Sequence, residues 1–104
     1  EFSIVLGVLH DPIKQEQIQV VSITAYDAND HSWLEGVTIE GSISKGQNKI
    51  QSFDGVTDKN GRLTYSWKIE KNLDPGLYVL NAHGLYQHRT LGTQSLYFLV
   101  EPSE

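Results

Sequence analysis

Four histidines and a set of turn carboxylates are the residues of this sequence best suited to chemistry. Imidazole nitrogens suit Zn²⁺ and Cu²⁺, and carboxylates together with carbonyls suit Ca²⁺. Asp27 and Asp58 each begin a turn-like segment, whereas His83 and His88 lie further along the chain. Neither acidic segment continues to the acidic residue that a full Ca²⁺ loop requires. Because Asp and Asn also form turns by bonding their own backbone, we expect turns here, with no bound metal or cofactor.

Aromatic side chains suggest a second kind of site, because a flat ring can stack on a sugar ring. Trp33 and Tyr86 fall in expected loops and are the candidates for a ligand or sugar contact. Tyr26 and Tyr97 fall on the outer faces of expected strands. The alternative for Trp33, which we favour, is that its ring folds over the end of the domain beside Leu34 and caps the core.

Sequence signatures of catalysis are not found. The chain contains no G-x-S-x-G, H-E-x-x-H, P-loop or G-x-G-x-x-G motif. It also has no Cys, which excludes disulfides, thiolate metal sites and Cys nucleophiles. A chain of 104 residues forms one core but has little surface left for a cleft. We therefore expect a domain that is not an enzyme.

Charge and hydropathy exclude two classes of partner. The formal net charge is −5, whereas binding to nucleic acid requires a basic face that releases counterions. No apolar run approaches the ~20 residues that span a bilayer, so we expect no membrane insertion. The sequence contains no Met, and we expect it to be part of a longer protein, with residues 101–104 beginning a linker or tail.

Apolar and polar residues alternate with a period of two, and Gly, Asn, Asp or Pro interrupts the alternation every eight to twelve residues. The clearest case is 62–69, where Leu63, Tyr65, Trp67 and Ile69 alternate with polar side chains. This pattern predicts an all-β antiparallel sandwich in which each strand has one buried face. We predict seven strands, at about 2–9, 18–26, 37–44, 48–54, 62–69, 77–83 and 93–100.

The same alternation predicts which side chains form the core. The first strand is apolar on both faces, so its register stays open. Among the aromatic residues we expect Tyr65, Trp67, Tyr78 and Phe98 to be buried. The other inward residues are predicted to be Val21, Ile23, Ala25, Val37, Ile39, Gly41, Ile43, Leu80, Ala82, Leu96 and Val100.

The last two strands carry apolar residues on their outward faces as well. If Tyr78 and Phe98 face the core, then Leu77, Val79, Tyr97 and Leu99 face outward and form an apolar stripe. A contiguous stripe on a monomer usually marks a contact surface, so we predict packing against another domain or a second copy. In the alternative, the first strand or the connection after it covers this face.

The residues expected in the turns resemble those of a known protein family. The relevant residues are Asp27, Gly36-Val37, Thr57-Asp58-Lys59-Asn60-Gly61, Pro75-Gly76-Leu77-Tyr78 and Val100. In this order they resemble the bacterial and archaeal immunoglobulin-like domains found in tandem on surface proteins, including the invasin and intimin group. The resemblance implies an immunoglobulin-like sandwich over residues 1–100, whose loops bring the candidate metal residues to one end. It also implies a tyrosine corner at Tyr78.

The function implied by the resemblance is that of a non-catalytic module in an extracellular or cell-surface protein. Such a module acts as a spacer, an adhesion domain or a protein-interaction domain. Its partners would be neighbouring domains of the same chain or another protein. The alternative is a carbohydrate-binding module appended to a secreted enzyme, and a small metal-binding sandwich comes third.

Overall fold

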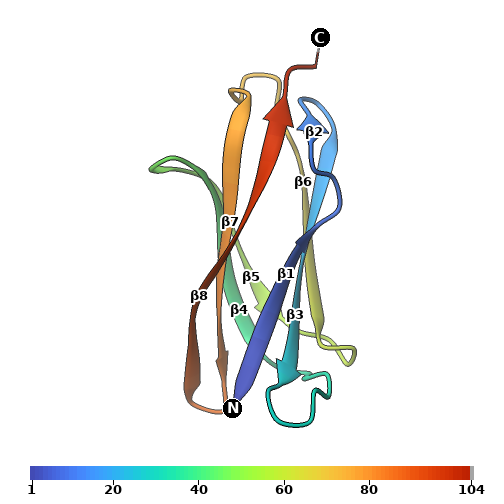
Figure 1. Ribbon diagram of the computed structural model, residues 1–104, viewed down its shortest axis with the longest axis vertical. Coiled ribbons are helices and arrows are strands. Elements are labelled where there is room, and N and C mark those ends of the chain that lie inside the picture. The colour runs from blue at the N-terminus through green and yellow to red at the C-terminus, as the bar shows by residue number, and fades with distance from the viewer. Residues whose placement is uncertain (104) are drawn as a thin grey trace.

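Eight β-strands form in the computed structural model, which describes residues 1–103 (Figure 1). Seven match the predicted segments, and the eighth, β2, is too short to show alternation. The strands are β1 (Phe2–Val8), β2 (Ile13–Lys14), β3 (Ile18–Asp27), β4 (Thr38–Lys45), β5 (Asn48–Val56), β6 (Arg62–Lys68), β7 (Gly76–Tyr86) and β8 (Arg89–Glu101).

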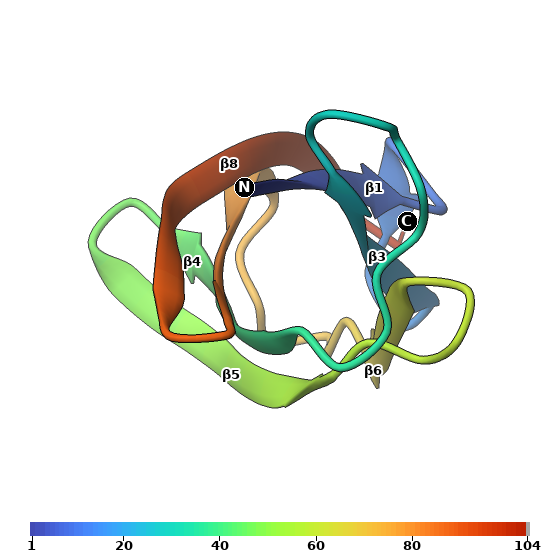
Figure 2. The same cartoon turned by 90° about the horizontal axis from the view of Figure 1, so that it is seen from below.

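Two sheets pack face to face and confirm the predicted sandwich. One sheet has the order β1-β3-β6, and the other has the order β2-β8-β7-β4-β5. All paired strands are antiparallel except β2, which runs parallel to the end of β8. Seen along the long axis, the strands surround a single interior (Figure 2). In the part of the chain described, no helix is present that is long and apolar enough to cross a membrane.

The core lies between the inward faces that the alternation predicted. Val21, Ile23 and Ala25 of β3 have no exposed surface, and Leu80 and Phe98 are equally enclosed from the other sheet. Leu96 is half-buried at the edge of this set. Gly41 is inward as predicted. The Phe53 ring lies directly over it, at the place where a Cβ atom would collide. The sequence prediction of the core is therefore confirmed for β3 and β7, and for β4 and β8 except at the half-buried Gly41 and Leu96.

The prediction that Tyr65 and Trp67 are buried is wrong, since both are half-buried. They lie on β6, which pairs only with β3 and forms one edge of the sandwich. The Tyr65 ring stacks on Phe53 at 4.8 Å, and its hydroxyl accepts a hydrogen bond from Gln51 Nε2 at 2.6 Å. This contact closes the seam between β5 and β6. Strand alternation cannot distinguish an edge strand from a central one.

The first strand takes the register that buries Phe2 and Ile4 and leaves Val5 exposed. After it, the chain crosses to the other sheet, where β2 places Ile13 in the core. Gln19 fixes this crossing, because its buried amide donates to the His10 carbonyl at 2.7 Å and accepts from the His10 N–H at 3.0 Å. The crossing was not predicted, since a polar residue on an inward face gives no sign of its partner.

Beyond the end of β8 at Glu101, the structure describes only residues 102 and 103. The Ser103 N–H donates to Gln15 Oε1 at 3.1 Å, and Glu104 lies outside the described residues. The predicted linker role of residues 101–104 stays a prediction.

The tyrosine corner is present at the start of β7. The Tyr78 ring is buried, and its hydroxyl donates to the Asp74 carbonyl at 2.7 Å. Burial raises the pKa of Tyr78 above its ordinary value of 10.0, and the nearby Asp74 charge raises it further. Both effects disfavour the phenolate, so the folded chain holds this proton more tightly than the unfolded chain does.

Tyr78→Phe is expected to lower the free energy of unfolding by about 1 kcal/mol, because the Asp74 carbonyl loses its donor. A raised pKa stabilises the fold below about pH 10, and this contribution is lost as the pH rises through the folded-state pKa. Urea unfolding at neutral pH and near pH 11 should therefore show a steeper alkaline loss in the wild type than in the variant. The exposed Tyr97→Phe is the control, and equal alkaline losses for wild type and Tyr78→Phe would contradict the prediction.

Trp67 carries the one buried side-chain N–H that has no hydrogen-bond partner among the described residues. Trp67→Phe is expected to stay within about 1 kcal/mol of the wild type, because it removes an unsatisfied donor together with part of the ring. Trp67→Ala should lower the free energy of unfolding by about 3 kcal/mol, because the indole packs edge-on against Phe98, with the ring centres 6.3 Å apart, and this packing is lost. Urea unfolding of both variants measures the difference, and a Trp67→Phe cost as large as that of Trp67→Ala would contradict the prediction.

Candidate functional site

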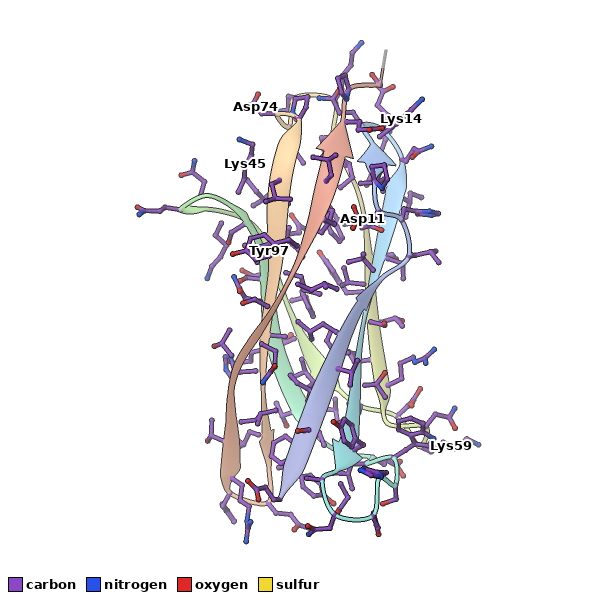
Figure 3. The ribbon with its side chains drawn as sticks, in the orientation of Figure 1. Asp11, Lys14, Lys45, Lys59, Asp74 and Tyr97 are labelled. Carbon is purple, nitrogen blue, oxygen red and sulfur yellow. The ribbon has the colours of Figure 1, made fainter. Side chains whose placement is uncertain are left out.

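The outer face of the five-stranded sheet carries the predicted apolar stripe. Leu77 lies opposite Leu99, and Val79 lies opposite Tyr97, so the four side chains form two adjacent cross-strand pairs. Leu77 and Tyr97 are 57% and 58% exposed, Leu99 is 40% exposed and Val79 is half-buried. Tyr97 projects away from the sandwich at the middle of β8 (Figure 3). The outward orientation of the stripe is confirmed, and its role as an interface stays a prediction.

Neither β1 nor the connection after it covers the stripe. The connection runs along the edge of β8, where Asp11 Oδ1 accepts a hydrogen bond from the Leu99 N–H at 3.0 Å. It therefore satisfies the backbone of the edge strand and leaves the outer side chains of β7 and β8 open. The alternative in which this segment buries the stripe is wrong for the described residues.

A polar hollow of about 510 Å³ lies on the same face, beside the stripe. It spans β5, β4, β7 and β8, and its polar lining includes Glu40, Ser42, Ser52, Asn81 and His83. Sequence reasoning did not find this hollow. Its signal, short polar residues at outward positions of several strands, becomes meaningful only when the strand order is known.

His83 was expected at the loop end of the sandwich, and this placement is wrong. β7 continues to Tyr86, because Gly84 and Leu85 still pair with β4 and Tyr86 pairs with Arg89 of β8. His83 therefore lies within the strand, opposite Glu40 of β4. Its Nε2 is 3.0 Å from Glu40 Oε1, and both side chains are substantially exposed.

The remaining metal candidates lie in turns at the loop end. Asp27 Oδ1 accepts the N–H of Asn29 at 2.8 Å, and Asp58 Oδ1 accepts the N–H groups of Asn60 and Arg62 at 2.8 and 3.0 Å. His88 adopts a positive φ of 65° in the turn between β7 and β8. Within residues 1–103, no group of three or more His, Asp or Glu side chains is arranged to hold a metal ion.

The carboxylate of Asp30, at the same end, also accepts hydrogen bonds from within its own loop. Asp30 Oδ1 accepts hydrogen bonds from the Ser32 N–H at 2.9 Å and the Ser32 hydroxyl at 2.8 Å. These bonds favour the ionised form and lower the pKa of Asp30. The loop carboxylates thus shape the turns, as their residue types predicted.

Of the two loop aromatics, Tyr86 packs on the core and Trp33 does not, the reverse of what was expected. Trp33 is 62% exposed, so the prediction that it caps the core is wrong. The chain is extended there, so successive side chains point to opposite sides, and it is Leu34 that packs against the core. Tyr86 instead covers this end, with its ring edge-on to Phe2 at 5.9 Å. Trp33 therefore offers a free ring, and Tyr86 only a partly buried one.

The sheet orders define an antiparallel sandwich of the immunoglobulin-like class, with β1, β3 and β6 facing β8, β7 and β4. No protein-family model matches the chain, and no curated protein sequence matches it. The alkylpurine DNA glycosylase AlkC of Pseudomonas fluorescens, solved bound to DNA with an abasic-site analogue, is similar in structure. It is 16% identical with a TM-score of 0.53, and the match covers 97% of this chain and 30% of that one.

A β-glucosidase of Listeria innocua, solved with gluconolactone, is similar too. It is 13% identical with a TM-score of 0.54, and the match covers 96% of this chain and 16% of that one. The chain thus spans less than a third of either protein. At these identities the likeness shows the fold alone.

Asp58→Ala is expected to lower the free energy of unfolding by about 1 kcal/mol, because two backbone N–H groups lose their acceptor. Lys59→Ala in the same turn has no such bond to lose and is the control. Thermal unfolding with Ca²⁺, with Zn²⁺ and with EDTA should give the same midpoint for the wild type, since no ligand set is assembled. A metal-dependent rise in the midpoint that disappears in Asp58→Ala would contradict this.

Proposed function

We propose that this domain is a non-catalytic module of a larger extracellular or cell-surface protein, in which it acts as a spacer and interaction unit. The observation that carries the proposal is the apolar stripe, formed by Leu77, Val79, Tyr97 and Leu99. These residues contact one another across β7 and β8 and remain open to solvent. Their partner is a neighbouring domain of the same protein or a second copy of this chain.

The stripe has the character of an interface centre. It contains a Tyr between aliphatic side chains, and such aromatic residues often supply a large share of binding energy. The polar residues around it, including Ser44 and Ser95, provide a rim that stays hydrated. Burying the stripe against a partner would remove apolar surface from water.

The solved structures support a modular role in a limited way. In each of them a sandwich of this shape forms only a part of a longer chain. Their enzymatic activities reside in whole proteins of which this chain matches a fraction. The extracellular or surface location rests on the turn motifs that resemble tandem surface domains.

Carbohydrate binding at the loop end is the second candidate, because Trp33 exposes most of its ring. A platform there would need further free rings beside it. Tyr26 is half-buried next to His31, with the ring centres 6.1 Å apart, and Tyr86 packs on Phe2. The loop end thus offers one ring rather than a platform, which is why we place the interaction role first.

Replacing both Val79 and Leu99 with Thr is expected to weaken association through the stripe by at least about tenfold, since two aliphatic contacts are lost. Sedimentation velocity over a concentration series measures self-association of the 104-residue chain. The same double variant in the longer protein that the proposal requires tests docking on a neighbouring domain.

Val5→Thr with Ile18→Thr is the matched control, because these exposed residues lie on the outer face of the opposite sheet. The control should associate like the wild type. Unchanged association of the stripe variant in both settings, with its folding intact, would remove the stripe as an interface.

A further inference from the structure

The polar hollow lies where one row of short side chains crosses the sheet beside a row of longer ones. Ser52, Ser42, Asn81 and Ser95 are successive partners across β5, β4, β7 and β8. Asp54, Glu40 and His83 form the row on one side. Strand spacing makes the hollow about 14 Å long across the four strands, which suits an elongated ligand.

Two polar groups in the hollow are already held in position. His83 Nε2 lies 3.0 Å from Glu40 Oε1, which leaves the second Glu40 carboxylate oxygen free to accept a hydrogen bond. The Ser95 hydroxyl donates to Asn81 Oδ1 at 2.6 Å, which leaves the Asn81 amide N–H groups free to donate. Both groups are carried by strands that are paired on both edges. An acceptor and a donor thus lie on neighbouring rows of a rigid surface.

The chemistry of the hollow excludes several classes of ligand. A peptide strand adds to a sheet edge, here the free edge of β5, whereas the hollow lies on the sheet face and is centred on β4 and β7, whose edges are both paired. An anion would meet the carboxylates of Glu40 and Asp54, with Lys49 as the one Lys or Arg in the lining. A wholly apolar partner would bury these charges without compensation. A neutral molecule with many hydroxyl groups satisfies them, because each hydroxyl both donates and accepts.

We propose that the hollow binds a neutral oligosaccharide, with Glu40 accepting from one sugar hydroxyl and Asn81 donating to another. Tyr97 lies on β8 two residues beyond Ser95, on the same face, and provides an exposed ring against which a neighbouring sugar packs. This site is separate from Trp33 and goes beyond the interaction role proposed above. It does not require the apolar stripe to bind a protein.

The test is titration of the ¹⁵N-labelled chain with neutral hexasaccharides of β-linked glucose, xylose and mannose, followed by amide chemical shifts. At least one of them is expected to shift the backbone amides of Ser42 and Ser52 and the side-chain amide of Asn81. Asn81→Ala and Glu40→Ala should each weaken that binding by about tenfold, since each removes the side-chain group that would bond the ligand. Ser42→Gln should abolish it by filling the hollow.

Thr64→Ala, on the outer face of the opposite sheet, is the matched control and should bind like the wild type. The stripe variant with Val79→Thr and Leu99→Thr should also keep its sugar affinity, which separates this proposal from the proposed interface. The proposal is overturned if no neutral hexasaccharide shifts these amides at about 10 mM, a concentration that detects even millimolar affinity. It is equally overturned if the shifts gather at Trp33, if Asn81→Ala binds like the wild type, or if an oligogalacturonate binds as tightly.

Discussion

The hydrogen-bond ladder of β7 is the constraint on which the rest of this sandwich depends. β7 pairs with β4 on one edge and with β8 on the other, so its register sets the register of both neighbours. Tyr78, Leu80 and Ala82 face the core, and Asn81 and His83 face water. A slip of one residue would bury the last two and expose the first three. The cost of desolvating an amide and an imidazole while exposing three core side chains makes one register dominant.

Closure of the sandwich determines how its interior is used. The Phe53–Tyr65 stack and the Gln51 hydrogen bond close one seam, and β2 places Ile13 against the other. Over residues 1–103, the interior between the two sheets is therefore filled by packed apolar side chains. The loops at one end are similarly committed, because Asp58 uses its carboxylate to hold the turn that leads into β6.

The outer face of the five-stranded sheet combines two surfaces with different physical properties. Around Tyr97 the side chains are apolar and gain by leaving water, whereas around Glu40 they are polar and gain only when a ligand satisfies them. The two surfaces adjoin because strand pairing places consecutive outward rows about 7 Å apart. Tyr97 lies at the boundary between the two surfaces, on the same outward face as Ser95 and Val79.

The sequence alone determined the strands, their buried faces and the turns, because each depends on local alternation or on the backbone preferences of a few residues. Val21 and Leu80 face inward, Leu77 and Tyr97 face outward, and the Tyr78 hydroxyl returns to the backbone, all as predicted. Only the tertiary structure decided which strands are neighbours and how far each extends. It left Trp67 half-exposed on an edge strand and moved His83 from a loop to the side of Glu40. It also aligned Ser42, Ser52 and Asn81 into one hollow, because cross-strand proximity depends on pairings between residues far apart in the chain, which no local pattern records.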